Sequence, residues 1–492
     1  MSSQDKRMQL SKPNYSTPLA ISLLVLLLAG CSTQEAYRKP VMDVPEQFKQ
    51  AMPDAGEAGI WQTARGQAEL PGPWWQRFGD AELDRLQAIA AEGSPGIAQA
   101  VANLRSAQAA LAGSRSSLFP TLGASASGTR SRSSGSSSTG SASGSGSGRI
   151  SESYSLGLNA SWELDLWGRV SGAVSASQAS AQASSDDLAA VRLSTQASVA
   201  QSYFSLRAAE AQARLLENTL KAYAQSLQLT RNRYAAGVAS AADVAQAETQ
   251  IKSTEAQLIE SRLTRAQLEH ALAALLGQAP AAFGIEATGR LPAPPQVPAM
   301  LSSQLLEQRP DIAAAERRVA AANAQVGVAR AAFFPALTLS AAGGYQGSSL
   351  SDLVRLPNLF WSLGPALAQT LFDGGARSAA VESARASMDL AAANYRQTVL
   401  TALQEVEDNL AAAEALAREQ LVQDQALAAA QKALDIVSNQ YKAGTVAYLN
   451  VLTAQATVLS TQSNVISVQN RRLAAINTLL KNVAGRWEPL ER

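Results

Sequence analysis

The sequence is poor in the residues from which most enzyme and metal sites are built. Among its 492 residues there are one cysteine, Cys31, and one histidine, His270, which excludes a disulfide framework, a cysteine-rich metal site and most histidine chemistry. The 41 Lys and Arg balance 40 Asp and Glu, and this argues against the basic surface that nucleic-acid binding requires. We therefore expect a non-enzymatic protein without catalytic or metal-binding residues, and we interpret His270, which lacks a Cys or His partner, as structural.

Long hydrophobic runs are also scarce. The clearest one, residues 19–30, has 12 residues, whereas a membrane-spanning helix needs about 20. Basic residues precede the run (Lys6, Arg7 and Lys12), and it ends in Leu28-Ala29-Gly30-Cys31. This arrangement predicts a signal peptide over residues 1–30, with Met1 or Met8 as its start.

The position of the cysteine predicts a lipoprotein. A thiol directly after small residues is what the bacterial lipoprotein pathway modifies, so we expect diacylglycerol and palmitate on Cys31. Ser32 follows, where an aspartate would have favoured retention in the inner membrane. The expected location is the outer membrane, lipid-anchored and extending into the periplasm. An ordinary signal peptide with a chance cysteine is the alternative.

Two long parts of the chain resemble each other. Arg233-Tyr234-Ala235-Ala236-Gly237 matches Gln440-Tyr441-Lys442-Ala443-Gly444 at an offset of 207 residues, and residues 118–122 match 333–337 at an offset of 215. The two offsets differ by 8, so the first copy has eight extra residues. They fall in the Ser/Gly tract Ser131–Gly148, which we interpret as a loop. A repeat on this scale predicts two copies of one structural unit, with insertions placed in loops.

Proline and glycine are missing from four stretches: 173–236, 238–276, 376–443 and 445–484. Helices usually end within about 20 residues, so these stretches predict unusually long ones. The first carries a heptad seam that closes on Tyr234; its members are Leu206, Ala213, Leu220, Leu227 and Tyr234, interleaved with Ala209, Leu216 and Tyr223. The second copy keeps Leu416, Leu427, Leu434, Val437 and Tyr441 but places Gln420 and Gln423 in the seam. Gly237 and Gly444 should form the turns of two antiparallel hairpins.

Between these stretches lie segments whose apolar residues alternate with small or polar ones. They are residues 154–165 and 359–368 and, more briefly, 337–341 and 122–126. A period of two predicts four strands with one apolar face. Four strands cannot close a barrel, and open edges cannot lie in hydrocarbon. Two chains would give eight strands, whose barrel is filled by side chains, whereas three chains would give twelve strands and a lumen. The number of strands therefore favours a homotrimer. Four half-buried strands of a soluble sheet are the alternative.

Over residues 31–487 the chain resembles the TolC/OprM-type outer-membrane factors, in particular the efflux lipoproteins. The motifs that carry the resemblance are the lipobox, Pro73-Trp74-Trp75-Gln76-Arg77-Phe78-Gly79-Asp80, Leu118-Phe119-Pro120, Trp162-Glu163-Leu164-Asp165-Leu166-Trp167-Gly168, Arg309-Pro310-Asp311-Ile312, Phe333-Phe334-Pro335 and Leu371-Phe372-Asp373-Gly374-Gly375. The resemblance implies an α+β membrane protein that forms a homotrimeric 12-stranded β-barrel continued by a periplasmic barrel of 12 helices. It also implies two partners, a periplasmic membrane-fusion adaptor and an inner-membrane pump, with the resistance-nodulation-division type expected.

The resemblance assigns functions to the hairpin turns. It implies that the tips contact the adaptor through Arg233, Tyr234, Gly237, Tyr441, Lys442 and Gly444, and that they close the duct. The gate candidates are Asp243, Leu449, Asn450 and Thr453. Family members often carry an acidic residue and an arginine where this chain has Thr453 and Ala456, so a charged latch is not expected. Asp243 is alternatively the N-cap of the helix after the turn.

The expected organisation is a signal peptide (1–30), an N-terminal equatorial segment (31–80), a first repeat (81–279), a linker (280–305), a second repeat (306–485) and a tail (486–492). The expected function is a passive trimeric duct that exports small molecules or drugs in a tripartite efflux system. A duct for protein or oligosaccharide secretion and a coiled-coil envelope scaffold without a channel are the alternatives.

Overall fold

The computed structural model describes residues 36–40, 61–62, 73–132, 150–295, 297–298 and 309–483. The predicted signal peptide, Cys31 and the Ser/Gly tract beyond Arg132 lie outside these residues. The chain divides into two compact units. One, here called the sheet unit, contains residues 107–181 and 317–392; the other, the helical unit, contains residues 182–316 and 393–492 together with 41–106.

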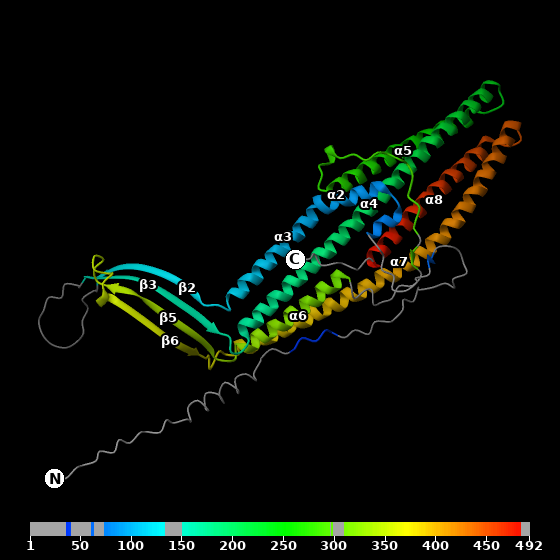
Figure 1. The fold of residues 1–492 in the computed structure, drawn as a ribbon. Helices are drawn as coiled ribbons and strands as arrows, with labels where there is room; N and C mark the ends of the chain where they lie inside the picture. Colours follow the sequence, from blue (N-terminus) through cyan, green and yellow to red (C-terminus); the bar gives the residue numbers. More distant parts are fainter. Residues whose placement is uncertain are drawn as a thin grey trace, which may run out of the picture. The chain divides into compact units, whose positions relative to one another are not determined.

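The sheet unit contains the four predicted strands. They are β2 (Thr121–Arg132), β3 (Ile150–Leu164), β5 (Ala336–Gly347) and β6 (Leu359–Ala368), and they form one antiparallel sheet in the order β2-β3-β5-β6 (Figure 1). The two hairpins have related registers. Thr121 pairs with Ser161, and shifting these residues by 215 and 207 gives Ala336 and Ala368, which pair with each other.

The two faces of the sheet differ in polarity. From the register, one face carries mostly apolar or aromatic side chains: Leu122, Ala124, Ala126, Leu156, Leu158, Ala160, Trp162, Leu164, Leu337, Leu339, Ala341, Tyr345, Leu359, Trp361, Leu363, Pro365 and Leu367. The same face includes Gly343 and, toward one end, Gly128, Tyr154 and Gly347, followed by Arg130 and Glu152. The other face is polar or small apart from Phe360, and Ser127 and Ser155 share a hydrogen bond of 2.8 Å there. Leu122, Trp361, Leu363 and Leu367 are each well exposed. The period of two has therefore separated an exposed apolar face from a polar one.

An aspartate caps each long helix where it follows the sheet. Asp165 accepts hydrogen bonds from the backbone N–H groups of Val170 and Ser171 at 2.9 and 2.7 Å. Burial of this carboxyl opposes ionisation, but the bonds from Ser171 and Val170 hold the pKa of Asp165 below its ordinary value. In the second half Asp373 accepts from Gly375 and Arg377. Both helices thus begin with an acceptor for their free N–H groups.

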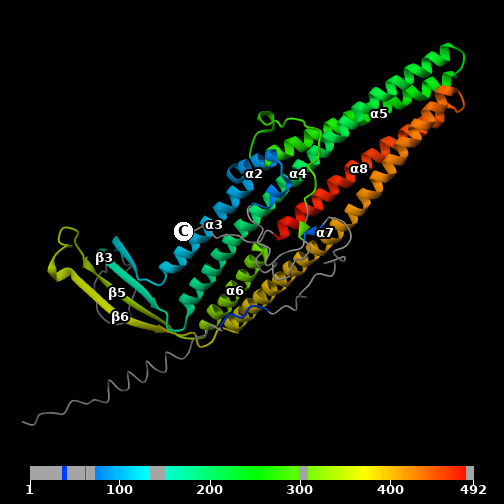
Figure 2. The same cartoon turned by 45° about the vertical axis from the view of Figure 1, so that its right-hand side comes forward.

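The predicted long helices are confirmed. They are α4 (Arg169–Ala235, 67 residues), α5 (Ala241–Leu275, 35), α7 (Ala376–Ala443, 68) and α8 (Tyr448–Val483, 36). At about 1.5 Å per residue, α4 and α7 are each roughly 100 Å long. α5 returns alongside α4 and α8 alongside α7 (Figures 1 and 2), with Ser261 donating to the Ala209 carbonyl in the first hairpin. No helix in the described parts of the chain is both long and apolar enough to cross a membrane.

Shorter elements complete the chain. The described residues also form the helices α2 (Ala81–Gly93), α3 (Pro95–Ser116) and α6 (Pro310–Ala331). Short 3-10 turns precede α2, follow α5 and lie between β5 and β6; they are η1 (Trp74–Phe78), η2 (Pro280–Ala282) and η4 (Leu356–Asn358). A two-residue parallel bridge, which the sequence did not predict, links β1 (Trp61–Gln62) and β4 (Val297–Pro298). α6 begins at Pro310 and has Asp311 in its first turn.

The core of the helical unit forms where η1 and α2 pack on the middle of α4. Phe78 lies 4.6 Å from Phe204 between ring centroids, and the Tyr203 hydroxyl donates to Asp80 at 2.7 Å. Trp74 is 4% exposed, so it packs in this core. The hydroxyl of Tyr203 is buried and bonded to a carboxylate, and both effects raise its pKa. Aromatic packing around Tyr203 therefore fixes the segment from Trp74 to Asp80 on α4.

The predicted heptad seam is correct except at its end. Leu206, Ala213 and Leu227 are buried in the first hairpin, but Tyr234 is 51% exposed. Tyr441, at the equivalent position of the second hairpin, is 5% exposed because it packs on the first hairpin. Tyr234 has no equivalent neighbour in a single chain. The prediction that both tyrosines close a seam was wrong for Tyr234.

Two glycines of the polar face offer a matched test of the sheet. A Cβ at Gly344 would lie 2.2 Å from the carbonyl oxygen of Leu156, whereas a Cβ at Gly364 would meet nothing within 4 Å. We expect Gly344→Ala to lower the free energy of unfolding by about 1–3 kcal/mol, because the backbone of β3 must move. Gly364→Ala should change it by less than about 0.5 kcal/mol. Equal thermal stability of the two variants in detergent would contradict this close approach.

Candidate functional site at the hairpin tips

The two tips share one backbone motif. The N–H of Val238 donates to the Arg233 carbonyl, and that of Thr445 donates to the Gln440 carbonyl, at 2.8 and 3.0 Å. Each turn also contains a glycine with positive φ, 74° at Gly237 and 81° at Gly444. Glycine adopts this conformation without the steric cost that a Cβ would bring, so each long helix can end and reverse.

The helices that leave the two turns begin differently. Ser240 caps α5 by accepting from the N–H of Asp243 at 3.1 Å, and the Asp243 carboxylate accepts from the N–H of Ser240 at 2.9 Å. Asp243 is thus the third residue of α5 and the second partner of a capping box, and not the N-cap itself. At the second tip Ala447 and Asn450 occupy the equivalent positions, and alanine has no side-chain acceptor.

Arg233 joins the two tips. Its guanidinium donates to the carbonyl oxygens of Tyr441 and Lys442 at 3.1 and 3.2 Å, and it lies 4.7 Å from the centre of the Tyr441 ring. Carbonyls in the last turn of a helix lack intrahelical partners and carry the negative end of the helix dipole. The arginine therefore clamps the end of α7 to α4, and Lys442 contributes its backbone to this contact.

A buried cluster lies behind this clamp. It contains Leu227, Ala247, Tyr441, Tyr448 and Val451, from all four helices of the two hairpins. The rings of Tyr441 and Tyr448 lie 5.5 Å apart, and the Tyr441 hydroxyl is 3.4 Å from that of Thr230. Burial raises the pKa of Tyr448, and the negative charge of Asp243 adds to the increase. The cluster makes the two hairpins of a chain one packed body at their tips.

The gate candidates on α8 lie outside this cluster. Leu449 is 55% exposed, and Asn450 and Thr453 are exposed beside it. The Thr453 hydroxyl donates to the Leu449 carbonyl of its own helix at 2.9 Å, so it forms no link to another helix through that bond. Leu449, Asn450, Thr453 and Ala456 form an uncharged surface of α8.

Sequence reasoning missed the partners of Arg233. It named Arg233, Tyr234, Gly237, Tyr441, Lys442 and Gly444 as one set of tip residues, but the structure connects only Arg233, Tyr441 and Lys442 across the hairpins. The difference between Arg233 and Gln440, in segments that otherwise differ only at Ala235 and Lys442, was the available signal. It also missed Tyr448, which only the packing of α8 on α4 reveals.

Two further clusters of charge have structural roles. Arg309 is buried and bonded to Asp311 at 2.7 Å, Glu405 at 3.3 Å and Asn482 at 3.1 Å. Burial works against ionisation of Asp311, but Arg309 lowers the pKa of this carboxyl below its ordinary value. A second buried pair, Arg207 and Glu210, binds backbone groups of residues 286–289. The first cluster holds the start of α6 against α7 and α8, and the second holds the connection that follows α5 against α4.

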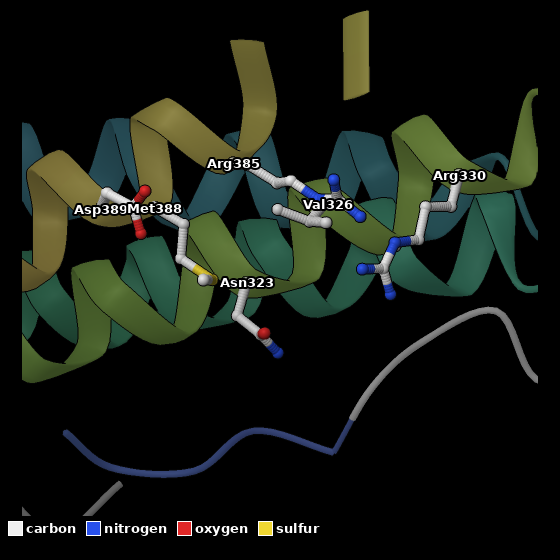
Figure 3. A pocket seen from close by; sticks show the side chains of 7 residues that line it. Asn323, Val326, Arg330, Arg385, Met388 and Asp389 are labelled. Atoms are coloured by element: carbon white, nitrogen blue, oxygen red, sulfur yellow. The ribbon is translucent and has the colours of Figure 1, made fainter. Parts of the chain in front are cut away.

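Chemistry beyond packing finds little support in the described residues. They contain no group of three or more His, Cys, Asp or Glu that could hold a metal. A pocket of about 170 Å³ lies between α6 and α7 and is lined by Asn323, Val326, Gly327, Arg330, Arg385, Met388 and Asp389 (Figure 3). Its lining combines two guanidiniums, one carboxylate, one amide and two apolar side chains. It has no nucleophilic side chain beside the carboxylate.

Comparison with known proteins identifies relatives along nearly the whole chain. The model of the outer membrane efflux protein family matches residues 86–278 and 301–485. The chain is 33% identical over 473 residues to the pyoverdine export outer membrane protein OpmQ of Pseudomonas aeruginosa, covering 96% of this chain and 97% of OpmQ. It is 30% identical to the cation efflux system protein CusC of Escherichia coli O157:H7, covering 88% and 90%. The solved outer-membrane channel OprN superposes with a TM-score of 0.83 at 29% identity, covering 93% of this chain and all of that one.

The capping box allows the two interpretations of Asp243 to be separated. We expect Ser240→Ala and Asp243→Ala each to lower the stability of the first turn of α5 by about 1 kcal/mol, because each removes one capping bond. Hydrogen exchange of the amides of residues 240–244 measures this, and Asn450→Ala in the second tip is the matched control. If Asp243→Ala leaves exchange unchanged and alters the cation preference of single channels, Asp243 is a gate residue and not a cap.

Proposed function

Because the chain belongs to the outer membrane efflux protein family and serves as an outer-membrane efflux channel, we propose that three copies form one passive duct. The observation that carries this proposal is the four-stranded sheet, which exposes an apolar face and has two unpaired edge strands. Each copy contributes four strands to a barrel in the outer membrane and two long helical hairpins to a periplasmic tube.

The sheet has the dimensions of a membrane wall. The apolar face follows β3 from Leu156 to Leu164, and a transmembrane strand needs about 9–11 tilted residues. The face ends at an ion pair between Arg130 and Glu152, 3.3 Å apart. The free N–H and C=O groups of β2 and β6 need partners in hydrocarbon, and strands of further copies supply them. Twelve strands leave the polar face lining a water-filled lumen, whereas eight would be filled by side chains.

The hairpin tips form the periplasmic end of this duct. The tip surface around Tyr234, Gly237 and Gly444 is exposed, and we assign to it the contact with a periplasmic membrane-fusion adaptor. The adaptor connects the duct to an inner-membrane pump, for which we propose the resistance-nodulation-division type. In a trimer, Leu449, Asn450 and Thr453 of α8 each form a ring of three, and narrowing at these uncharged rings closes the lumen. Asp243 supplies a negative charge nearby.

The names of the relatives support the export of small molecules or ions. OpmQ is named for pyoverdine export and CusC for cation efflux. A polar lumen without a binding pocket suits a passive duct whose selectivity comes from the pump, so we propose small molecules, including drugs, as cargo. A duct for protein or oligosaccharide secretion is the second candidate. A scaffold without a channel would not need the exposed apolar face of the sheet.

Assembly and conduction test the proposal together. Protein purified from outer membranes in detergent should have the mass of a trimer by light scattering, and in planar bilayers it should show small, infrequent openings because the tips are closed. Leu363→Asp, in the middle of the apolar face, should abolish membrane insertion, while Ser362→Asp on the polar face should preserve it. A monodisperse monomer or dimer that conducts would overturn the trimer.

We also propose that the mature chain begins at Cys31 and carries diacylglycerol and palmitate there. The support is the sequence Leu28-Ala29-Gly30-Cys31. Mass spectrometry of the N-terminal peptide should show a triacylated Cys31. Cys31→Ser with a replacement signal peptide should still give some working channel, because the barrel also holds the protein in the membrane. Cleavage elsewhere without modification would refute the lipid anchor.

A further inference from the structure

One aromatic side chain lies on the otherwise polar face of the sheet. Phe360 is the second residue of β6, and by the alternation of the strand it points to the side opposite Leu359 and Trp361. Among the described residues of this face, Phe360 is the one apolar side chain larger than alanine. Glu163 is the one charged residue described there, and Arg169 donates to its carboxylate. The ring of Phe360 therefore stands out on an uncharged surface of small and polar residues.

Glycines let this ring lie flat on the sheet. Phe360 pairs with Gly344 of β5, and Gly344 pairs with Gly157 of β3, so the three residues lie at one level of three neighbouring strands. A Cβ at Gly157 would be 3.6 Å from the Cζ atom of Phe360. Because neighbouring strands are about 4.8 Å apart, the ring reaches this point only by extending across Gly344. One face of the ring then covers the backbone while the other faces outward, and Phe360 is 37% exposed.

Only one copy of the repeat has this arrangement. Shifting Phe360 by 207 residues gives Ser153, and shifting Gly344 by 215 gives Thr129; these two also pair with each other. The first copy thus has two hydroxyl side chains where the second has an aromatic ring opposite a glycine. Packing over glycine accounts for one face of the ring and leaves the other face open to whatever lies on that side of the sheet.

We propose that the outward face of Phe360 is a stacking site for planar aromatic cargo, in particular aromatic cations. The proposal rests on the trimeric duct proposed above, in which the polar face lines the lumen, and it adds three such rings, one per copy, near the loop end of the barrel. The face of an aromatic ring attracts cations, and offset stacking on a second ring adds to this attraction. A weak site of this kind suits a duct, because cargo must leave as readily as it enters.

The surroundings of the ring make the site selective. Serine and glycine offer no aromatic contact, so stacking on Phe360 distinguishes an aromatic molecule from a saturated one of the same charge and similar size. A merely structural ring would cover Gly344 and Gly157 equally well, yet it would not distinguish the two molecules. The two roles are therefore separable by measurement.

Thiol accessibility tests on which side the ring lies. Phe360→Cys and Trp361→Cys place a thiol on opposite faces of the same strand. In intact outer membranes a sulfonated thiol reagent should modify the cysteine at 360 about tenfold faster than the one at 361, because a charged reagent does not enter hydrocarbon. The unsubstituted protein, whose one cysteine is Cys31, gives the background. The reverse order would place the polar face outside the lumen, and the duct and the stacking site would both be wrong.

Block of the open channel tests stacking. Benzylammonium and cyclohexylmethylammonium have the same charge and similar size, and only the first is aromatic. In planar bilayers, at a potential that opens the unsubstituted channel, benzylammonium should reduce the potassium current about twofold more than cyclohexylmethylammonium. Phe360→Leu, which keeps an apolar side chain over the glycines, should abolish this difference. Phe360→Tyr and the control Ser153→Ala, at the equivalent position of the first copy, should retain it.

The outcomes separate the stacking site from the duct. Thermal stability of the trimer records any packing lost in Phe360→Leu, and lost packing alone does not change the ratio of the two blocks. If the cysteine at 360 reacts faster and the channel conducts, but both cations block the unsubstituted protein equally, the stacking site is wrong while the duct stands. A difference that survives in Phe360→Leu would overturn the site in the same way.

Discussion

The constraint on which the rest of the structure depends is the hydrogen bonding of the sheet edges. The strands β2 and β6 have neighbours on one side only, and the face that joins them is apolar. In hydrocarbon each unpaired N–H and C=O group costs free energy, so the sheet is stable in a membrane only when it closes on further strands. A chain with four such strands is an incomplete wall, and this is the physical reason for proposing that further copies complete it.

The sequence predicted the elements because their periods are strong and local. Alternation at 154–164 and 359–368 placed the strands, and the absence of proline and glycine placed the long helices to within a few residues. The contacts of individual side chains were less predictable. Tyr234 and Tyr441 are in matching segments, yet one is exposed and the other buried, because burial depends on which hairpin lies beside each. A repeat in sequence cannot show that a single chain satisfies only one of two equivalent contacts.

The tip residues show the same limit in more detail. Asp243 was a gate or cap candidate from its position alone, and the capping bonds with Ser240 appear only when the turn of five residues is built. Thr453 was named because a charged latch is missing there, and its hydroxyl bonds to its own helix. Arg233 was named as a surface residue, whereas its guanidinium reaches the end of α7. Long flexible side chains find partners across helices, and no local pattern in the sequence encodes that choice.

Fusion of two repeats into one chain permits what six identical units could not. A ring of identical hairpins would have one kind of contact, with equal strength all round and no preferred place to part. In this chain the two halves keep the same turns and glycines while Arg233 and Gln440 differ. The guanidinium of Arg233 holds the end of α7, so the side chains give the two tips different contacts on one shared backbone. The duplicated sequence therefore keeps one backbone in both tips while the side chains of its two halves have diverged.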